Sequence, residues 1–270
     1  MNKRLSLGNK LSFVKKNGGI ISILFIHGNA VSSKIFLKQF SDPRLNDYTL
    51  WSIDLPGHGD SPKAENPSDV YSVKSMGKIV ADFVKENINQ PVVIVGSSLG
   101  GNIAIEAAEE LDNVKGLFLC GTGPLASVDD IAKAFLPHPA NAYSFKEEHT
   151  EEELIELYKL CVGDFTEYYE LIKNDISRSD KLFRSTLLST ISNGLFSNEK
   201  EILRKMKIPV AIVHAGNENV VNLDYLKELE IPSLWKNNIQ IIKNAYHFMH
   251  LTHSAYFNKL LKEFVETECK

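Results

Sequence analysis

The 270-residue sequence predicts an α/β fold: a mostly parallel central sheet with helices on both faces and one inserted helical segment. Short apolar segments rich in β-formers alternate with longer segments of helical periodicity, which is typical of βαβ units. The β-rich segments are almost continuously apolar, as expected for strands that helices cover on both sides. The alternation is interrupted once, between about residues 124 and 206.

The first predicted strands are LSFVKK and IISILFIH, and the Asn17-Gly18-Gly19 turn between them predicts a hairpin. Three predicted helices have apolar residues at helical spacing and cover residues 73–85, 102–111 and 256–265. The other predicted strands are YTLWSID, PVVIVG, VKGLFLC, IPVAIVH and IQIIKN.

The stretch from Pro124 to Met206 contains helix-like segments such as EEELIELYKLCV and DKLFRSTLLSTI, and no convincing strand. Gly163 and Asn193-Gly194 interrupt these segments. We therefore expect a core built from residues 1–123 and 207–270, with residues 124–206 inserted between two strands of the sheet.

Composition excludes several classes of protein. The formal net charge of −4 offers no basic excess for nucleic acid, and no apolar run approaches the roughly 20 residues that span a bilayer. Met1 to Asn17 has no apolar segment typical of a secretory signal. The cysteines, Cys120, Cys161 and Cys269, lack the spacing of a disulfide framework or metal site. We expect a cytoplasmic protein with neither nucleic-acid nor membrane partners.

The strongest chemical signal is Gly96-Ser97-Ser98-Leu99-Gly100, between a predicted strand and a predicted helix. A nucleophile elbow needs this strand-to-helix turn with small flanking residues, because the serine must project from a tight turn. The following helix N-terminus favours developing negative charge. Ser98 is therefore the candidate nucleophile, on the strength of the motif together with its place between a strand and a helix.

A serine nucleophile needs a base and a carboxylate that orients the base. His247 follows the last predicted strand, and Glu218 follows the strand IPVAIVH. Both lie at the carboxyl ends of strands, where open α/β sheets form their sites. Asp224 is the nearest alternative to Glu218. We expect His27 and His58 to stabilise loops through hydrogen bonds rather than to take part in chemistry.

These motifs together resemble the α/β-hydrolase superfamily over nearly the whole chain. Ile26-His27-Gly28-Asn29 is similar to the family's His-Gly loop, and the segment from Asp54 to Ser61 is similar to its D-x-P-G-H-G-x-S turn. The segment NAYHFMHLTHSAYFN, from Asn244 to Asn258, resembles the region that carries the catalytic histidine.

The resemblance implies the α/β-hydrolase fold, with an oxyanion hole formed by the backbone N–H groups of Asn29 and Leu99. It also implies that residues 124–206 form a lid over the pocket, and that neither a cofactor nor a metal is needed. The sequence departs from the family at two positions: Glu218 stands where aspartate is usual, and Tyr246 stands where glycine is usual.

The resulting hypothesis is a serine hydrolase that cleaves a small or medium ester-like substrate through an acyl-enzyme, as a monomer or homodimer. Carbon–carbon hydrolases, enol-lactonases and thioesterases share the serine triad and stay open. Haloalkane dehalogenases and epoxide hydrolases are disfavoured because their nucleophile is aspartate. The alternative from another class is a binding or signalling protein that retains the fold, with very slow or no turnover.

Overall fold

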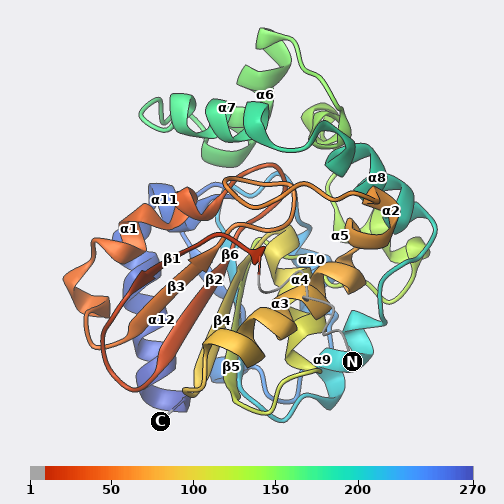
Figure 1. Cartoon of the computed structure of the whole chain (residues 1–270). Coiled ribbons are helices and arrows are strands. Elements are labelled where there is room, and N and C mark those ends of the chain that lie inside the picture. Colours follow the sequence, from red (N-terminus) through yellow and green to blue (C-terminus); the bar gives the residue numbers. More distant parts are fainter. Residues whose placement is uncertain (1–9, 270) are drawn as a thin grey trace, which may run out of the picture.

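A computed structural model describes residues 10–269 of the chain. The described residues form a seven-stranded sheet in the order β1-β3-β2-β4-β5-β6-β7, and every neighbouring pair except β1·β3 is parallel (Figure 1). Each predicted strand segment contains one strand, which confirms the predicted fold class. The strands are β1 (Phe13–Lys16), β2 (Ser22–Ile26), β3 (Thr49–Ile53), β4 (Val92–Ser97), β5 (Val114–Cys120), β6 (Val210–Ala215) and β7 (Gln240–Ile242).

Helices cover both faces of this sheet (Figure 1). The α-helices are α1 (Leu37–Phe40), α2 (Pro67–Val70), α3 (Val73–Asn87), α4 (Leu99–Ala108), α5 (Ile131–Ala134), α6 (Glu151–Val162), α7 (Tyr169–Arg178), α8 (Lys181–Ser192), α9 (Glu199–Lys205), α10 (Leu223–Lys227), α11 (Met249–Thr252) and α12 (Ser254–Glu268). The 3-10 helices are η2 (Ser33–Phe36), η3 (Pro43–Leu45), η4 (Val128–Asp130), η5 (Pro139–Phe145) and η6 (Trp235–Asn237).

The strands contribute alternate residues to two separate hydrophobic cores. In β2, Leu24 and Ile26 pack with the buried residues of α3 and α4, whereas Ile23 and Phe25 pack with those of α12. This division follows from the two-residue period of a strand. All five residues of β2 are buried, which explains why the strand reads as a continuous apolar run.

The predicted hairpin between the first two strands is wrong, because β1 pairs antiparallel with β3 and not with β2. The glycines between the strands pass close to the backbone that precedes β3. Gly19 N donates to Asp47 O at 3.1 Å, and a Cβ on Gly18 would lie 2.1 Å from Tyr48 O. The turn therefore carries β1 across to the far side of β3, a long-range contact that local turn residues do not reveal.

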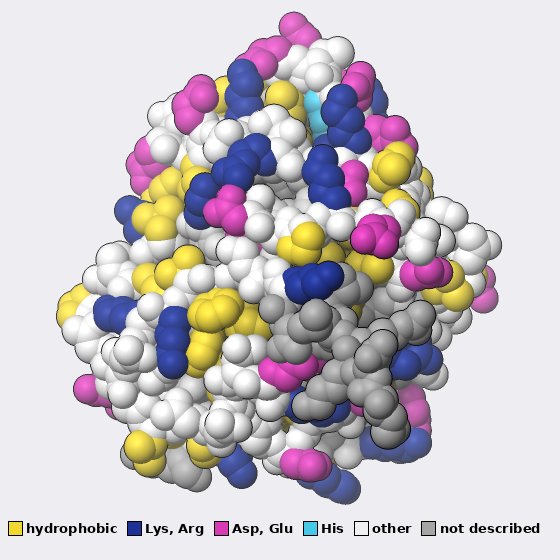
Figure 2. Space-filling view, in the orientation of Figure 1, with side chains coloured by type: hydrophobic (Ala, Val, Ile, Leu, Met, Phe, Trp, Pro, Cys, Tyr) yellow, Lys and Arg dark blue, Asp and Glu magenta, His cyan; other side chains and the backbone are white. Residues whose placement is uncertain are grey.

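Residues 124–206 connect β5 to β6 through helices and contain no strand. In Figure 1, α6 and α7 lie above the sheet, whereas α9 lies low beside α4. The surface of this upper region carries both lysine or arginine and acidic side chains (Figure 2). The ion pairs within residues 124–206 include Lys173–Glu151 and Lys181–Glu148.

Within residues 10–269, no helix is long and apolar enough to cross a membrane. The expectation that the chain starts without a signal segment concerns residues that lie largely outside the described range.

Candidate active site

Ser98 lies in a sharp turn between β4 and α4. Its backbone has φ 54° and ψ −125°, a conformation that residues other than glycine rarely adopt. A Cβ on Gly96 would lie 2.4 Å from Gly101 Cα, and one on Gly100 would lie 2.2 Å from Ile26 O. The turn therefore requires glycine on both sides of Ser98, and the hydrogen bond from Ser98 N to Cys120 O (2.8 Å) fixes it to β5.

His247 and Glu218 form a buried hydrogen-bonded pair. The Glu218 oxygens Oε1 and Oε2 lie 2.9 and 3.1 Å from His247 Nδ1, and Oε1 also accepts from Val220 N at 3.0 Å. The exposed fraction of these side chains is 4% for His247 and 0% for Glu218. Burial alone would raise the pKa of Glu218, but the adjacent His247 and the Val220 N–H outweigh it, and the pKa is lowered. Glu218 is thus an ionised acceptor that orients the imidazole.

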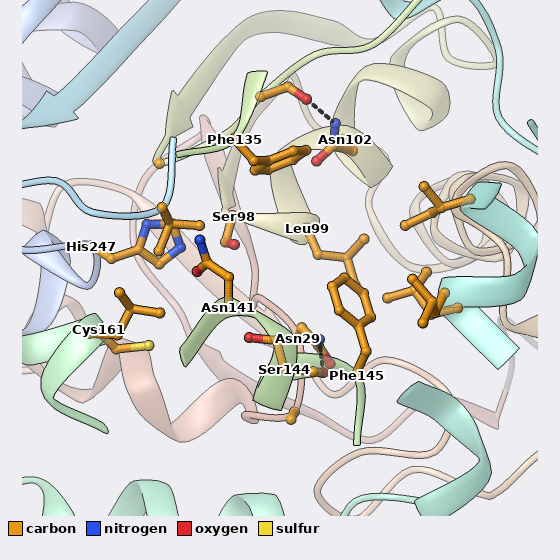
Figure 3. Close-up of a pocket in the computed structure, with 18 of the residues that line it drawn as sticks. Asn29, Ser98, Leu99, Asn102, Phe135, Asn141, Ser144, Phe145, Cys161 and His247 are labelled. Carbon is orange, nitrogen blue, oxygen red and sulfur yellow. Dashed lines mark hydrogen bonds between the residues drawn. The ribbon is translucent and has the colours of Figure 1, made fainter. Parts of the chain in front are cut away.

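His247 and Ser98 line one pocket, and Figure 3 shows them with Asn141 around the same part of its wall. Gly121, at φ 58°, leaves the space that the imidazole occupies, because a Cβ there would lie 2.9 Å from His247 Nδ1. Gly28 similarly packs against Ser98, and its Cβ would lie 3.1 Å from Ser98 Cβ. Both side chains therefore depend on glycines in neighbouring loops for their positions.

The backbone N–H groups of Asn29 and Leu99 have no protein acceptor within residues 10–269. Both residues line the pocket beside Ser98. Leu99 is the first residue of α4, where backbone N–H groups have no partner inside the helix. The two N–H groups are available to a ligand oxygen.

Two buried histidines fix the loop that carries Asn29. His27 Nε2 accepts from Leu55 N at 2.9 Å, and His58 Nε2 accepts from Ala30 N at 3.2 Å. The loop after β2 and the loop after β3 thus each supply a histidine that accepts a backbone hydrogen bond from the other loop. The expected role of His27 and His58 in loop structure agrees with these contacts.

The pocket has a volume of about 410 Å³ and mostly apolar walls. Much of the wall comes from the inserted segment, including Phe145, Leu157, Cys161, Ile176 and Leu187. This size and character are typical of small-molecule sites. Burial raises the pKa of the Cys161 thiol to about 12, so this cysteine is not a thiolate nucleophile.

Asp224 and Tyr246, which the sequence singled out, both lie outside the pocket lining. Asp224 is exposed on α10 and pairs with Lys227 at 2.8 Å, so the structure brings Glu218 and not Asp224 to His247. Tyr246 packs against Gly163 at the end of α6, where a Cβ would lie 2.3 Å from the Tyr246 ring. The tyrosine therefore supports the inserted segment and is not among the pocket-lining residues.

Comparison with known proteins shows the family to which this chain belongs. The sequence pattern of the alpha/beta hydrolase fold matches residues 21–254, most of the chain. The chain belongs to the α/β-hydrolase fold family. A pimeloyl-[acyl-carrier protein] methyl ester esterase from Neisseria meningitidis serogroup C is 27% identical over 252 residues, covering 90% of this chain and 93% of that protein.

Two solved structures are also similar to this chain. The N-acyl homoserine lactonase AidH, in complex with N-butanoyl homoserine, is 26% identical with a TM-score of 0.89, over 95% of this chain and 92% of that one. A putative aryl esterase from Burkholderia cenocepacia has a TM-score of 0.79 at 20% identity, over 95% and 94% of the two chains. The second similarity concerns the fold alone.

An acidic residue on the wall of this α/β-hydrolase pocket was not predicted from the sequence. Glu199, the first residue of α9, is 1% exposed and lies on the pocket wall. Burial raises its pKa to about 8, although the hydrogen bonds donated by Leu125 N and Asn102 Nδ2 favour the ionised form. The sequence shows only an acidic residue at a helix start, where glutamate is common, so no local signal distinguishes it.

We expect acid to destabilise the protein through its buried histidines. Burial lowers the pKa values of His27 and His58, and lowers that of His250 to about 3. The unfolded chain therefore binds protons below pH 6.5 that the folded chain does not, and the free energy of unfolding falls with pH. Glu199, whose raised pKa acts in the opposite direction, partly offsets this loss.

Between pH 7 and 5.5 we expect the free energy of unfolding to fall, as measured by urea unfolding. Glu199→Gln removes the opposing group, whose pKa in the folded protein is about 8, and should deepen this fall by roughly 2 kcal/mol. A free energy of unfolding that is constant over this interval would contradict the assignment of neutral buried histidines.

Proposed function

We propose that this α/β-hydrolase cleaves carboxylic ester bonds with Ser98 as nucleophile, His247 as general base and Glu218 as the acid that orients the base. The observation that carries the proposal is the buried hydrogen bond between Glu218 and His247, because His247 lines the same pocket as Ser98. The similarity to esterases and a lactonase supports the reaction class.

The hydrogen-bond pattern supports Nε2 of His247 as the atom that acts as the base. Because Glu218 accepts from His247 Nδ1, the proton of the neutral imidazole is on Nδ1, and Nε2 is free to accept a proton. Nε2 takes the proton of the Ser98 hydroxyl as its oxygen attacks the ester carbonyl carbon. Ionised Glu218 stabilises the imidazolium that forms.

The carbonyl oxygen becomes negatively charged in this step, and the free N–H groups of Asn29 and Leu99 stabilise it. His247 then gives its proton to the leaving alkoxide, and the alcohol departs from an acyl-enzyme. Water, deprotonated by His247, attacks the acyl carbon, and the acid product leaves with regeneration of the Ser98 hydroxyl.

The pocket points to a substrate with an apolar acyl chain of small to medium length. Its volume of about 410 Å³ and its phenylalanine and leucine walls accommodate such a chain. The inserted segment, residues 124–206, supplies many of these walls and takes the role of a lid over the core formed by residues 1–123 and 207–270.

A lactone is the second candidate substrate, since hydrolysis of its cyclic ester uses the same steps. The observation that favours it is the TM-score of 0.89 to the N-acyl homoserine lactonase. A further structure of that enzyme is a variant with a glutamate replaced by glycine, in complex with N-hexanoyl homoserine.

We expect hydrolysis of p-nitrophenyl esters to be greatest at medium acyl length and to fall for long chains, which the pocket cannot hold. The test is kcat/KM for esters of graded length beside N-hexanoyl homoserine lactone, with Ser98→Ala as control. A kcat/KM for the lactone well above that for the best ester would indicate that the protein is a lactonase. Well-folded protein that binds esters without turnover would overturn the proposal in favour of a binding protein.

A further inference from the structure

Glu199 is a buried carboxyl group on the pocket wall that the proposed mechanism does not use. It lies outside the Ser98, His247 and Glu218 group, and only 1% of its surface is exposed. Carboxyl groups are seldom fully buried without a cationic partner, and no salt bridge to Glu199 occurs in the described part of the chain. Its position therefore calls for a chemical explanation.

The two oxygens of this carboxyl group have different surroundings. Oε2 accepts hydrogen bonds from Asn102 Nδ2 and from Leu125 N, both at 2.8 Å. Oε1 has no partner among residues 10–269, yet it is not one of the fully enclosed side-chain atoms without a hydrogen bond. Since the residue is almost fully buried and lines the cavity, the accessible surface of Oε1 faces the pocket.

This arrangement suits a protonated carboxyl group. Burial, assisted by the nearby Glu106, raises the pKa of Glu199 to about 8, so the neutral form predominates at pH 7. An oxygen that accepts two N–H bonds acts as the carbonyl oxygen, which leaves the proton on Oε1. Glu199 then presents an O–H donor to an otherwise apolar cavity.

The location of Asn102 indicates which part of a substrate this donor meets. Asn102 lies four residues after Ser98 on α4, which is about 6 Å along the helix axis. Figure 3 shows Asn102 beside Phe135 on one wall of the pocket, and Ser98 lines the same pocket. A group that contacts Glu199 is therefore several bonds from the carbonyl that Ser98 attacks.

We propose that Glu199 determines substrate specificity by donating a hydrogen bond from Oε1 to a keto or hydroxyl oxygen on the acyl chain. This inference rests on the proposed ester hydrolysis. A plain alkyl chain leaves the donor without a partner in an apolar cavity, and a site built to hydrogen-bond a substrate oxygen discriminates strongly against analogues that lack it.

The test compares p-nitrophenyl alkanoates with their oxo counterparts, the oxo group being moved from the third to the seventh carbon. Wild-type protein is expected to prefer the oxo ester at one position by about 5- to 30-fold in kcat/KM. Glu199→Gln keeps an N–H donor in place of the O–H and should retain most of this preference. Glu199→Met has no donor and should lose it.

The ratio of the two substrates is measured on one preparation, so partial loss of folded protein cancels. Glu201→Gln changes a partly exposed residue of the same helix that does not line the pocket, so it is the control and should leave the ratio unchanged. If Glu199→Met does not fold, the wild-type protein still tests the inference. A ratio of kcat/KM that does not depend on the position of the oxo group along the acyl chain would overturn it.

A greater preference for a 6-aminohexanoyl ester than for any oxo ester would also overturn it, since an ammonium group requires an ionised Glu199. Hydrolysis of the unsubstituted esters tests the proposed function separately. Its absence would refute ester hydrolysis, whereas its presence without an oxo preference would refute only the role of Glu199.

Discussion

Replacement of Ser98 by alanine is expected to lower kcat/KM for the best ester by about 10⁴-fold or more. The variant retains the pocket and the His247–Glu218 pair but has no oxygen that can form the acyl-enzyme. The residual rate should come from water held near the Asn29 and Leu99 N–H groups. Initial rates at substrate concentrations below KM measure the effect directly.

The matched control is Ser98→Gly, because Ser98 has a positive φ of 54° that glycine adopts without strain. This variant should be as inactive as Ser98→Ala but more stable than wild type, by about 1 kcal/mol in urea unfolding. An inactive and stabilised protein excludes misfolding as the cause of inactivity. Substantial turnover by either variant would show that another group is the nucleophile.

Replacement of Glu218 by glutamine is expected to lower kcat by about 10³-fold, with a much smaller change in KM. Glutamine has nearly the same shape but no charge to stabilise the imidazolium of His247. Its amide N–H can also donate to Nδ1, which favours the tautomer with the proton on Nε2, where it cannot accept the serine proton. Burst-phase and steady-state kinetics with one p-nitrophenyl ester measure the loss.

Two control variants distinguish the roles of the nearby carboxylates. Glu218→Asp keeps the charge on a side chain one methylene shorter, so we expect a loss of about tenfold, smaller than that of glutamine. Asp224→Asn changes an exposed residue that pairs with Lys227 and should alter kcat less than twofold. A larger effect of Asp224→Asn than of Glu218→Gln would refute Glu218 as the triad acid.

Local patterns in the sequence predicted most of the fold. The buried strands β2 to β6 are visible because both of their faces pack on helices, so their residues form continuous apolar runs. The turn at Ser98 is visible because Gly96 and Gly100 are required by close backbone contacts. In these cases a local requirement restricts the residue type directly.

Features that depend on long-range packing were not predictable in this way. The pairing of β1 with β3 results from contacts of Gly18 and Gly19 with the backbone before β3. Glu199 reaches the pocket only because α9 packs against α4, nearly a hundred residues earlier in the chain. No local periodicity or motif contains that information, because a glutamate at the start of a helix has the same kind of neighbours in the sequence whether the helix start is buried or exposed.

The most direct test of the central claim, an activated Ser98 beside His247 and Glu218, is intact-mass analysis after treatment with a fluorophosphonate. We expect a single adduct that peptide mapping locates on Ser98, with no adduct on Ser98→Ala and much slower labelling of Glu218→Gln. An unlabelled but well-folded wild-type protein, or an adduct on a different residue, would contradict the claim.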